Sequence, residues 1–187
     1  MTMNIFTVVW VSWFLSEVLL NRLFRSKTRK EDSPDNHSLK ILWGTIFIAL
    51  TAGITIANLV SAPLIPYDLI RYTGLLLILA GIVLRFIAIR TLGRFFTVDL
   101  AIDPEHSLVK KGLYKYIRHP SYTGSLLSFL GMGLSLNSWI STLVIFIPVL
   151  FAFIHRIRIE EKLLVEQLGM SYREYKRQTK RLVPWVY

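Results

Sequence analysis

Residues 69–89 read LIRYTGLLLILAGIVLRFIAI, a run in which Arg71 and Arg85 are the only charged residues. A helix needs roughly 20 mostly apolar residues to cross about 30 Å of hydrocarbon, and this run is long enough to do so. Two earlier stretches, Ile5–Phe24 and Leu39–Ala62, are apolar over a similar length. The first half of the chain therefore predicts three membrane-spanning helices.

Two shorter apolar stretches follow, Tyr122–Leu136 and Ser138–Ile154, and only a turn around Asn137 separates them. They predict a tight helical hairpin that barely spans the bilayer. The composition supports a membrane location, because 53% of the 187 residues are hydrophobic and water-soluble domains rarely combine that share with such long runs. We therefore expect an all-α, multi-pass integral membrane protein with about five transmembrane helices.

The charges are unevenly placed along the chain. There are 22 Lys and Arg residues against 12 Asp and Glu residues, and most of the basic ones follow the first, third and fifth predicted helices. Five spans put these three regions on one side of the membrane, and the positive-inside rule makes that side cytoplasmic, with the N-terminus outside. A basic balance of this kind faces anionic membrane lipid, so no nucleic-acid partner is expected.

Two ions inside predicted spans need partners, because an isolated charge near mid-bilayer is costly. Glu17 lies in the first span and Arg85 late in the third, so a pair between the two helices, or snorkelling by Arg85, would relieve the cost. A role in an acceptor cavity is the alternative. No cysteine is present and the four histidines show no paired metal-ligand spacing, so no metal site is expected.

The connection between the third and fourth helices ends in YKYIRHPSYTG, residues 114–124. Pro120 suits the first position of a helix and holds His119 extended just before it. The unpaired amides at such a helix start can receive an anionic ligand group. Aromatic and basic residues also collect at any membrane interface, so this motif alone leaves a purely structural explanation open.

Residues 155–169 read HRIRIEEKLLVEQLG and follow the fifth predicted helix. At helical spacing Glu161 lies on an apolar stripe, while Arg156 and Glu160 share a neighbouring face. A carboxylate on an apolar stripe must find a partner, because an unpaired buried charge is strongly destabilising. The alternative to a functional role is an interfacial helix that Arg–Glu pairs on its surface stabilise.

The combination of Arg118-His-Pro-Ser-Tyr-Thr-Gly124, Glu160-Glu161 and Gly169 resembles the isoprenylcysteine carboxyl methyltransferase family. That family belongs to a group of small integral-membrane methyltransferases that includes phospholipid N-methyltransferases. The resemblance covers roughly residues 106–184, and the short chain looks like a minimal prokaryotic member. It implies S-adenosyl-L-methionine as the cofactor, in a cytoplasmic pocket formed by the connection before the fourth helix and the C-terminal helical tail.

The resemblance also implies a division of the chain and a set of site residues. Residues 1–90 would be a membrane anchor and acceptor-side wall, and residues 91–187 the methyltransferase catalytic region. The implied catalytic residues are Arg156, directed toward the methyl acceptor, and Glu161, the second acid of the pair. The implied cofactor-binding residues are His106, Ser107, Leu108, Val109, Tyr114, His119, Pro120, Ser121, Tyr122 and Glu160.

The expected reaction is methyl transfer to a lipophilic acceptor that enters from the bilayer, with the carboxylate of a prenylated cysteine as the leading candidate. A C-terminal carboxylate has a pKa of about 3.5, so it needs no general base at neutral pH. Arg156 would align this carboxylate through paired hydrogen bonds.

Three other functions remain open from the sequence. A phospholipid amine N-methyltransferase would need a base, and Glu161 or His119 could supply it. An NADPH-dependent membrane reductase could hold the 2′-phosphate of its cofactor with the basic tail. A non-enzymatic membrane adaptor would bind anionic lipid through residues 173–181.

Overall fold

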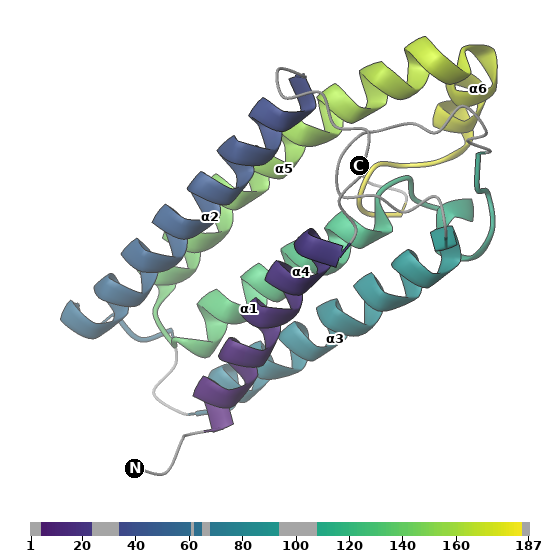
Figure 1. Cartoon of the computed structure of the whole chain (residues 1–187). Coiled ribbons are helices and arrows are strands. Elements are labelled where there is room, and N and C mark those ends of the chain that lie inside the picture. The colour runs from purple at the N-terminus through teal and green to yellow at the C-terminus, as the bar shows by residue number, and fades with distance from the viewer. Residues whose placement is uncertain (1–4, 24–33, 61, 65–67, 94–107, 185–187) are drawn as a thin grey trace.

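The computed structural model describes residues 5–23, 34–60, 62–64, 68–93 and 108–184, and their secondary structure is almost entirely helical (Figure 1). This confirms the predicted all-α class. The helices are α1 (Ile5–Leu23), α2 (Pro34–Leu59), α3 (Leu69–Leu92), the short 3₁₀ helix η2 (Gly112–Lys115), α4 (Pro120–Ser135), α5 (Trp139–Leu168) and α6 (Met170–Gln178).

Each of the five predicted apolar helices corresponds to one of the helices α1–α5. Within the described residues, α2, α3 and α5 contain stretches long and apolar enough to cross a membrane, namely His37–Leu59, Leu69–Leu92 and Trp139–Leu168. Helix α1 contributes a shorter apolar stretch, Ile5–Leu20, and α4 has 16 residues. The protein is therefore a membrane protein with several apolar helices, and the count of five full spans stays a prediction.

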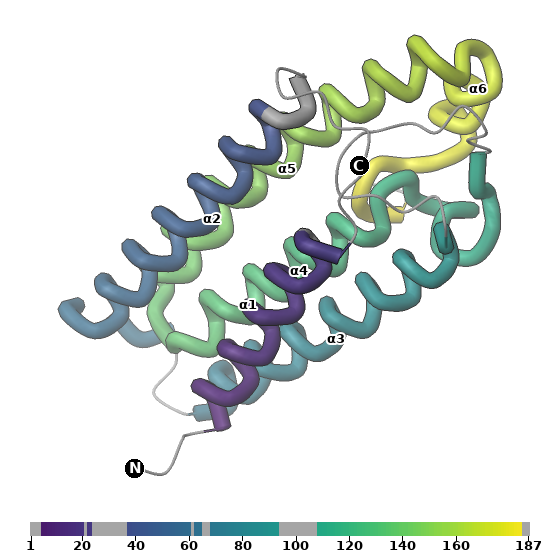
Figure 2. Tube along the Cα trace, in the orientation of Figure 1, coloured from purple at the N-terminus to yellow at the C-terminus, as the bar shows by residue number. Residues whose placement is uncertain are grey.

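The helices pack as two antiparallel pairs. Helix α3 lies along α4 and α2 lies along α5, while the short turn from α4 to α5 joins the pairs and α1 crosses near α3 (Figures 1 and 2). On α1, the Trp10 Nε1–H donates to Ser135 Oγ at 2.9 Å. The Trp13 ring packs edge-on against the Phe129 ring, with 4.9 Å between the ring centroids. These contacts tie the N-terminal helix to α4.

Four glycines bring α3 and α4 into direct backbone contact. A Cβ built on Gly131 would lie 2.5 Å from the Gly74 carbonyl oxygen, and one built on Gly81 would lie 2.5 Å from the Gly124 carbonyl oxygen. Neither distance leaves room for a side chain, and small residues of this kind typically let membrane helices approach closely. The packing fixes α4 along α3 and so fixes where α4 begins.

The loops at one end of the bundle are linked to each other. The Leu64 amide donates to the Asn137 side-chain oxygen at 3.2 Å, and the Trp139 amide donates to the Ala62 carbonyl at 3.2 Å. Figure 1 shows the first turn of α1 at this end and α6 at the opposite one. This arrangement is the one that five antiparallel passes require, although which end faces the cytoplasm stays a prediction.

The two ions singled out inside the predicted spans form a pair between helices. Arg85 Nη2 lies 3.2 Å from Glu17 Oε2, and Arg85 Nη1 also donates to Ser125 Oγ on α4. The Arg85 Nε–H is buried and has no hydrogen-bond partner within the described residues. The predicted pair is therefore confirmed, and one donor of Arg85 remains available.

Helix α5 is longer than predicted, which corrects the expected boundary at Ile154. It continues through the acidic motif to Leu168, because residues 155–168 contain no helix breaker and are rich in Arg, Glu, Lys and Leu, which favour helices. It ends where Gly169 takes a positive φ of 55° and donates its amide to the Val165 carbonyl at 3.1 Å. One rigid helix therefore carries both an apolar span and the acidic pair.

Candidate active site

The segment after α6 returns to the start of α4 and runs parallel to the residues before it. We call residues 179–182 the tail segment. The Arg118 amide donates to the Lys180 carbonyl at 2.8 Å, and the His119 amide donates to the Arg181 carbonyl at 3.0 Å. On the helix itself, Thr123 Oγ1 donates to the Leu182 carbonyl at 2.8 Å. The entry to α4 is therefore covered by a segment from the far end of the chain.

This pairing leaves fewer free amides for the anion that the sequence predicted to bind at the start of α4. The His119 amide, which the sequence left as a possible ligand donor, is already bonded to the tail segment. The sequence had no signal for this, because an isolated bridge between residues 117 and 180 leaves no periodic pattern.

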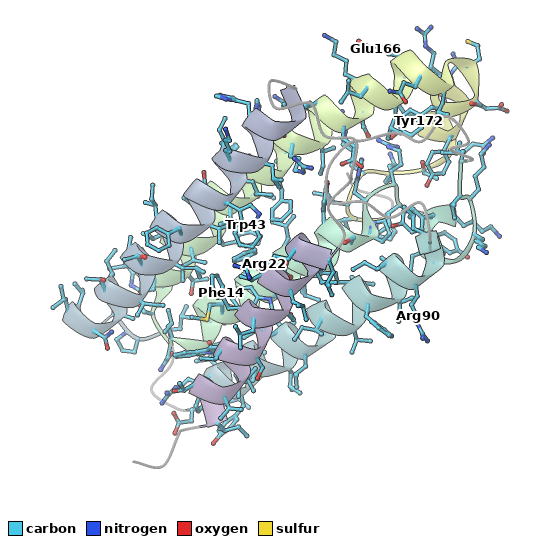
Figure 3. The ribbon with its side chains drawn as sticks, in the orientation of Figure 1. Phe14, Arg22, Trp43, Arg90, Glu166 and Tyr172 are labelled. Atoms are coloured by element: carbon cyan, nitrogen blue, oxygen red, sulfur yellow. The ribbon has the colours of Figure 1, made fainter. Side chains whose placement is uncertain are left out.

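Helix α6 closes against η2 through buried tyrosines. The Tyr175 hydroxyl donates to the Tyr114 carbonyl at 2.7 Å, and both rings are buried. Burial raises the pKa of both hydroxyls well above the usual range, so both stay protonated. Figure 3 shows Tyr172 on the inner side of the α5–α6 corner and Glu166 pointing outward.

Glu161 lies at the centre of a cationic cluster. Its Oε1 accepts from Arg118 Nε at 2.7 Å, and its Oε2 accepts from Arg181 Nη2 at 3.1 Å and lies 3.2 Å from Lys176 Nζ. The Glu161 side chain is only 3% exposed. The partner that the sequence required for this buried acid is thus a set of cations from the residues before α4, from α6 and from the tail segment.

Arg118 extends this cluster to the end of α6. Its Nη1 donates to the carbonyls of Lys176 and Thr179, which lie at the C-terminal end of that helix. Carbonyls at a helix end lack intrahelical partners, so the guanidinium satisfies them as it holds Glu161. Arg118 therefore joins three elements at one point.

Glu160, the neighbouring acid, has a different environment. Its Oε2 accepts from the Tyr122 hydroxyl at 2.8 Å, and that same hydroxyl accepts from Arg156 Nε at 3.1 Å. Arg156 also donates through Nη1 to Ser38 Oγ of α2 at 2.9 Å. The Glu160 side chain is 20% exposed, so one end of this chain of hydrogen bonds reaches an accessible surface while the other is buried.

His119 lies between the two acids. Its ring stacks on Tyr122 with an interplanar angle of 4°, its Nδ1 lies 3.8 Å from Glu160 Oε2, and its Nε2 lies 3.6 Å from Glu161 Oε1. Neither distance is a hydrogen bond. Within the described residues, the buried His119 Nε2 and the buried Ser121 Oγ have no hydrogen-bond partner, which leaves two polar atoms available to a ligand.

The structure brings together most of the predicted site residues that it describes. His119, Tyr122, Arg156, Glu160 and Glu161 form one connected cluster, and Pro120 and Ser121 begin the helix beside it. Tyr114 lies close enough for the charge of Glu160 to contribute to its raised pKa. Leu108 and Val109 are half-buried, while His106 and Ser107 lie outside the described residues.

Sequence reasoning missed several members of this cluster. Ser38 comes from α2, far away in the sequence, and no pattern indicated it. Lys176 and Arg181 were visible as part of the basic tail, and Arg118 as part of the motif, but nothing paired them with Glu161. The sequence indicated that Glu161 needs a partner, but many basic residues were possible partners and nothing favoured these.

A comparison with known protein families matches the part of the chain that carries most of this cluster. The model of the isoprenylcysteine carboxyl methyltransferase (ICMT) family matches residues 74–166, from within α3 to near the end of α5. The chain belongs to this family. The matched region contains the Glu160–Tyr122–Arg156 chain of hydrogen bonds and the α3–α4 contact.

Named relatives of this ICMT-family chain cover different lengths of it. The protein-S-isoprenylcysteine O-methyltransferase of Saccharomyces cerevisiae is 41% identical over 116 residues, which is 60% of this chain and 48% of the yeast protein. The mouse protein of the same name is 31% identical over 176 residues, which is 91% of this chain and 61% of that protein.

A solved structure matches almost the whole chain. It is described as the eukaryotic intramembrane Ras methyltransferase ICMT without a monobody, and it has a TM-score of 0.62 and 26% identity over 97% of this chain and 65% of its own. The chain thus spans about half to two thirds of the length of these relatives. The expected prokaryotic origin is untested, since these named relatives are eukaryotic.

Proposed function

We propose that this chain transfers a methyl group from S-adenosyl-L-methionine to the carboxylate of a membrane-embedded prenylated cysteine. Family membership supports the reaction class, and the names of the relatives support the acceptor. The observation that carries the proposal is the chain of hydrogen bonds from half-open Glu160 through Tyr122 to buried Arg156, at the end of a bundle of apolar helices. It puts an acid suited to the donor next to a cation suited to the acceptor.

The residues beside α4 fit the chemistry of this donor. S-adenosyl-L-methionine carries a sulfonium, an ammonium and a carboxylate, so its pocket needs an acid and polar donors. Glu160 is the accessible acid, and Ser121 and His119 have buried polar atoms that form no hydrogen bond with any described residue. The side chains of Leu108, Val109 and Tyr114 would line the adenine. When bound, the donor supplies the methyl carbon for an in-line displacement.

The protein's own contribution is mainly positioning. The acceptor carboxylate is ionised at neutral pH, so no residue has to remove a proton from it. Holding two reactants in the attacking geometry can lower a barrier by about 7–11 kcal/mol. We assign Arg156 to align the acceptor carboxylate, while its bond to Tyr122 orients Glu160 toward the donor. Too tight a grip on the carboxylate would slow the reaction, because its charge is lost as the ester forms.

Two further residues take part in this proposal. Arg85 is a second candidate for the acceptor carboxylate, because it is enclosed by α1, α3 and α4 and its Nε has no partner within the described residues. Glu161 has both oxygens engaged by cations, so we propose that it holds the tail segment in place and does not act as a base.

The expected orientation and division of the chain belong to the same proposal. The cluster lies at the end of the bundle that carries the basic α6 and tail segment, and the positive-inside rule assigns that end to the cytoplasm. The acceptor would then enter sideways from the bilayer while the donor arrives from water. The division at residue 90 stays a prediction, and the family match begins earlier, at residue 74.

A methyl-transfer assay on the purified chain tests the proposal. We expect label from S-adenosyl-L-methionine to appear in a farnesylcysteine analogue with a free carboxylate and not in its methyl ester, which serves as the matched control. Label in phosphatidylethanolamine instead would identify an N-methyltransferase, in which His119 is the available base. Thermal stabilisation by NADPH and not by S-adenosylhomocysteine would favour the reductase, and stabilisation by neither would contradict the proposed donor site.

The Arg156 and Arg85 assignments are separated by two conservative variants. Lysine keeps the charge but loses the paired donors of the guanidinium, so the variant at the acceptor position should lose turnover while it keeps S-adenosylhomocysteine affinity. We expect this result from Arg156→Lys. If Arg85→Lys gives it and Arg156→Lys does not, the acceptor assignment moves to Arg85.

A further inference from the structure

A concave site is lined by the tail segment and by the residues just before it. It is an open pocket of about 300 Å³ between the end of α6 and the start of α4. Its cationic lining comes from Arg118, Lys176, Arg177, Lys180 and Arg181. The reaction proposed above uses none of this surface directly.

The charge of this pocket differs from the charge that a site for the donor requires. Among its described residues the five cations are offset by the Glu161 carboxylate, which Arg118, Lys176 and Arg181 contact. Arg177 and Lys180 are exposed and form no ion pair with any described residue. S-adenosyl-L-methionine itself carries a net positive charge at neutral pH, so a pocket of this composition repels it. The ligand that fits must be an anion.

The location narrows the chemistry of that anion. The pocket lies where α5 has turned into α6 and where α4 begins, so it lies at the end of the apolar helices and not along them. Phosphate groups of lipids occupy this level of a membrane, and basic pockets beside the ends of membrane helices bind them. Guanidinium groups match the oxygens of a phosphate with paired hydrogen bonds.

We propose that the pocket lined by Arg118, Lys176, Arg177, Lys180 and Arg181 binds an anionic phosphate group, from a phospholipid headgroup or from soluble phosphate. Arg177 and Lys180 supply charge that no carboxylate among the described residues offsets. The cations on Glu161 add to the field and fix the shape of the pocket, because they hold α6 and the tail segment against α5. This site is independent of the methyl acceptor and of the donor.

A titration of the full chain in neutral detergent tests this site. The probes are dioctanoyl phosphatidylglycerol, inorganic phosphate and, as the uncharged control, dioctanoyl phosphatidylcholine, with thermal stability as the readout of binding. The test variant is Arg177→Gln with Lys180→Gln. The matched control is Arg158→Gln with Lys162→Gln, which removes one Arg and one Lys from exposed positions on α5 outside the pocket.

We expect phosphatidylglycerol to stabilise the wild-type chain and phosphatidylcholine to have no effect. The double variant in the pocket should weaken phosphatidylglycerol binding by roughly tenfold or more, while the control stays within about twofold of the wild type. The same dependence with inorganic phosphate at lower concentration would support the site and assign it to soluble phosphate.

Two results would overturn the proposal. One is the absence of any stabilisation of the wild-type chain by either phosphate compound, which does not depend on the folding of a variant. The other is an equal loss in the two double variants, which would mean diffuse attraction by surface charge. If the double variant is poorly folded by circular dichroism, Arg177→Gln alone should still lose affinity relative to Arg158→Gln.

Discussion

Glu160 and Glu161 are adjacent in the sequence, yet the regions around them differ in almost every physical respect. Around Glu161, cations from the residues before α4, from α6 and from the tail segment use both carboxylate oxygens, and the side chain is 3% exposed. Around Glu160, the neutral Tyr122 hydroxyl donates a hydrogen bond at 2.8 Å, and the side chain is 20% exposed. Successive residues on a helix point about 100° apart, so one residue step moves an acid from one environment to the other.

The difference indicates how a small membrane protein can build a ligand site with few residues. A buried acid surrounded by cations stabilises the fold, because its removal would leave those cations without a counter-charge. A half-exposed acid with a neutral donor keeps capacity for an incoming positive group. The first region fixes the geometry, and the second is available for binding. The predictions below test this division, from the largest expected effect to the smallest.

The largest effect is expected for Glu161→Gln. The change removes the counter-charge of Arg118, whose side chain is only 7% exposed, and breaking such a buried pair costs about 3–5 kcal/mol. We expect a loss of that order in the free energy of unfolding in detergent, together with protease cleavage near the tail segment. Glu166→Gln, an exposed position on the same helix, is the control and should leave both unchanged. Equal stability of the two variants would remove the structural role assigned to Glu161.

The second effect is on donor binding by Glu160→Gln. A charge-assisted hydrogen bond contributes about 1.5–3 kcal/mol, so the affinity for S-adenosylhomocysteine should fall by roughly 10-fold to 100-fold. The free energy of unfolding should change by less than about 1 kcal/mol, because Glu160 has a neutral partner. Calorimetric titration and denaturant unfolding measure the two quantities. Unchanged affinity would contradict the donor role of Glu160.

A smaller effect is expected for Tyr122→Phe, which keeps the stacking on His119 but removes the hydroxyl shared by Glu160 and Arg156. Both of its hydrogen bonds join it to ionised side chains and contribute about 1.5–3 kcal/mol each, but the hydroxyl acts on the reactants only through Glu160 and Arg156, so methyl transfer should slow by roughly 10-fold at most. If the hydroxyl links the two sites, the double variant Tyr122→Phe with Glu160→Gln should lose less than the sum of the single losses. Additive losses would mean that the two residues act separately.

The smallest effect is expected for Lys176→Gln. This lysine also contacts Glu161, at 3.2 Å, but its side chain is 33% exposed and two arginines remain on the same carboxylate. Exposed ion pairs contribute about 0–1 kcal/mol, so the unfolding midpoint should hardly move. A loss as large as that of Glu161→Gln would show that the lysine, and not the arginines, holds the cluster.

The sequence predicted the helices well because hydrophobic length is a local property. The predicted stretch Leu69–Ile89 became α3, Leu69–Leu92, and Tyr122–Leu136 became α4, Pro120–Ser135. The requirement for a partner also follows from local information, since an acid on an apolar stripe cannot stay unpaired. Both Glu161 and the Glu17–Arg85 pair follow that rule.

The parts that sequence could not predict depend on contacts between distant segments. Arg118 and Arg181 meet Glu161 only because the tail segment returns to the start of α4, and no periodic pattern encodes a single parallel bridge. The predicted end of the fifth helix was also wrong. The change from apolar to charged residues suggested a boundary at Ile154, but residues 155–168 contain no helix breaker. The helix propensity of these residues, and not their polarity, determines how far the helix extends.

The return of the tail segment has a consequence for the order of synthesis. Ribosomes make residues 179–182 after all of the helices α1–α6, so the bundle can insert into the membrane while Glu161 still lacks Arg181. A nascent chain that stops before residue 179 contains every one of these helices but not the segment that covers the entry to α4. The entry to α4 is therefore covered only after all six helices have been made, and we expect a stop codon just before residue 179 to yield an inserted product that lacks this cover.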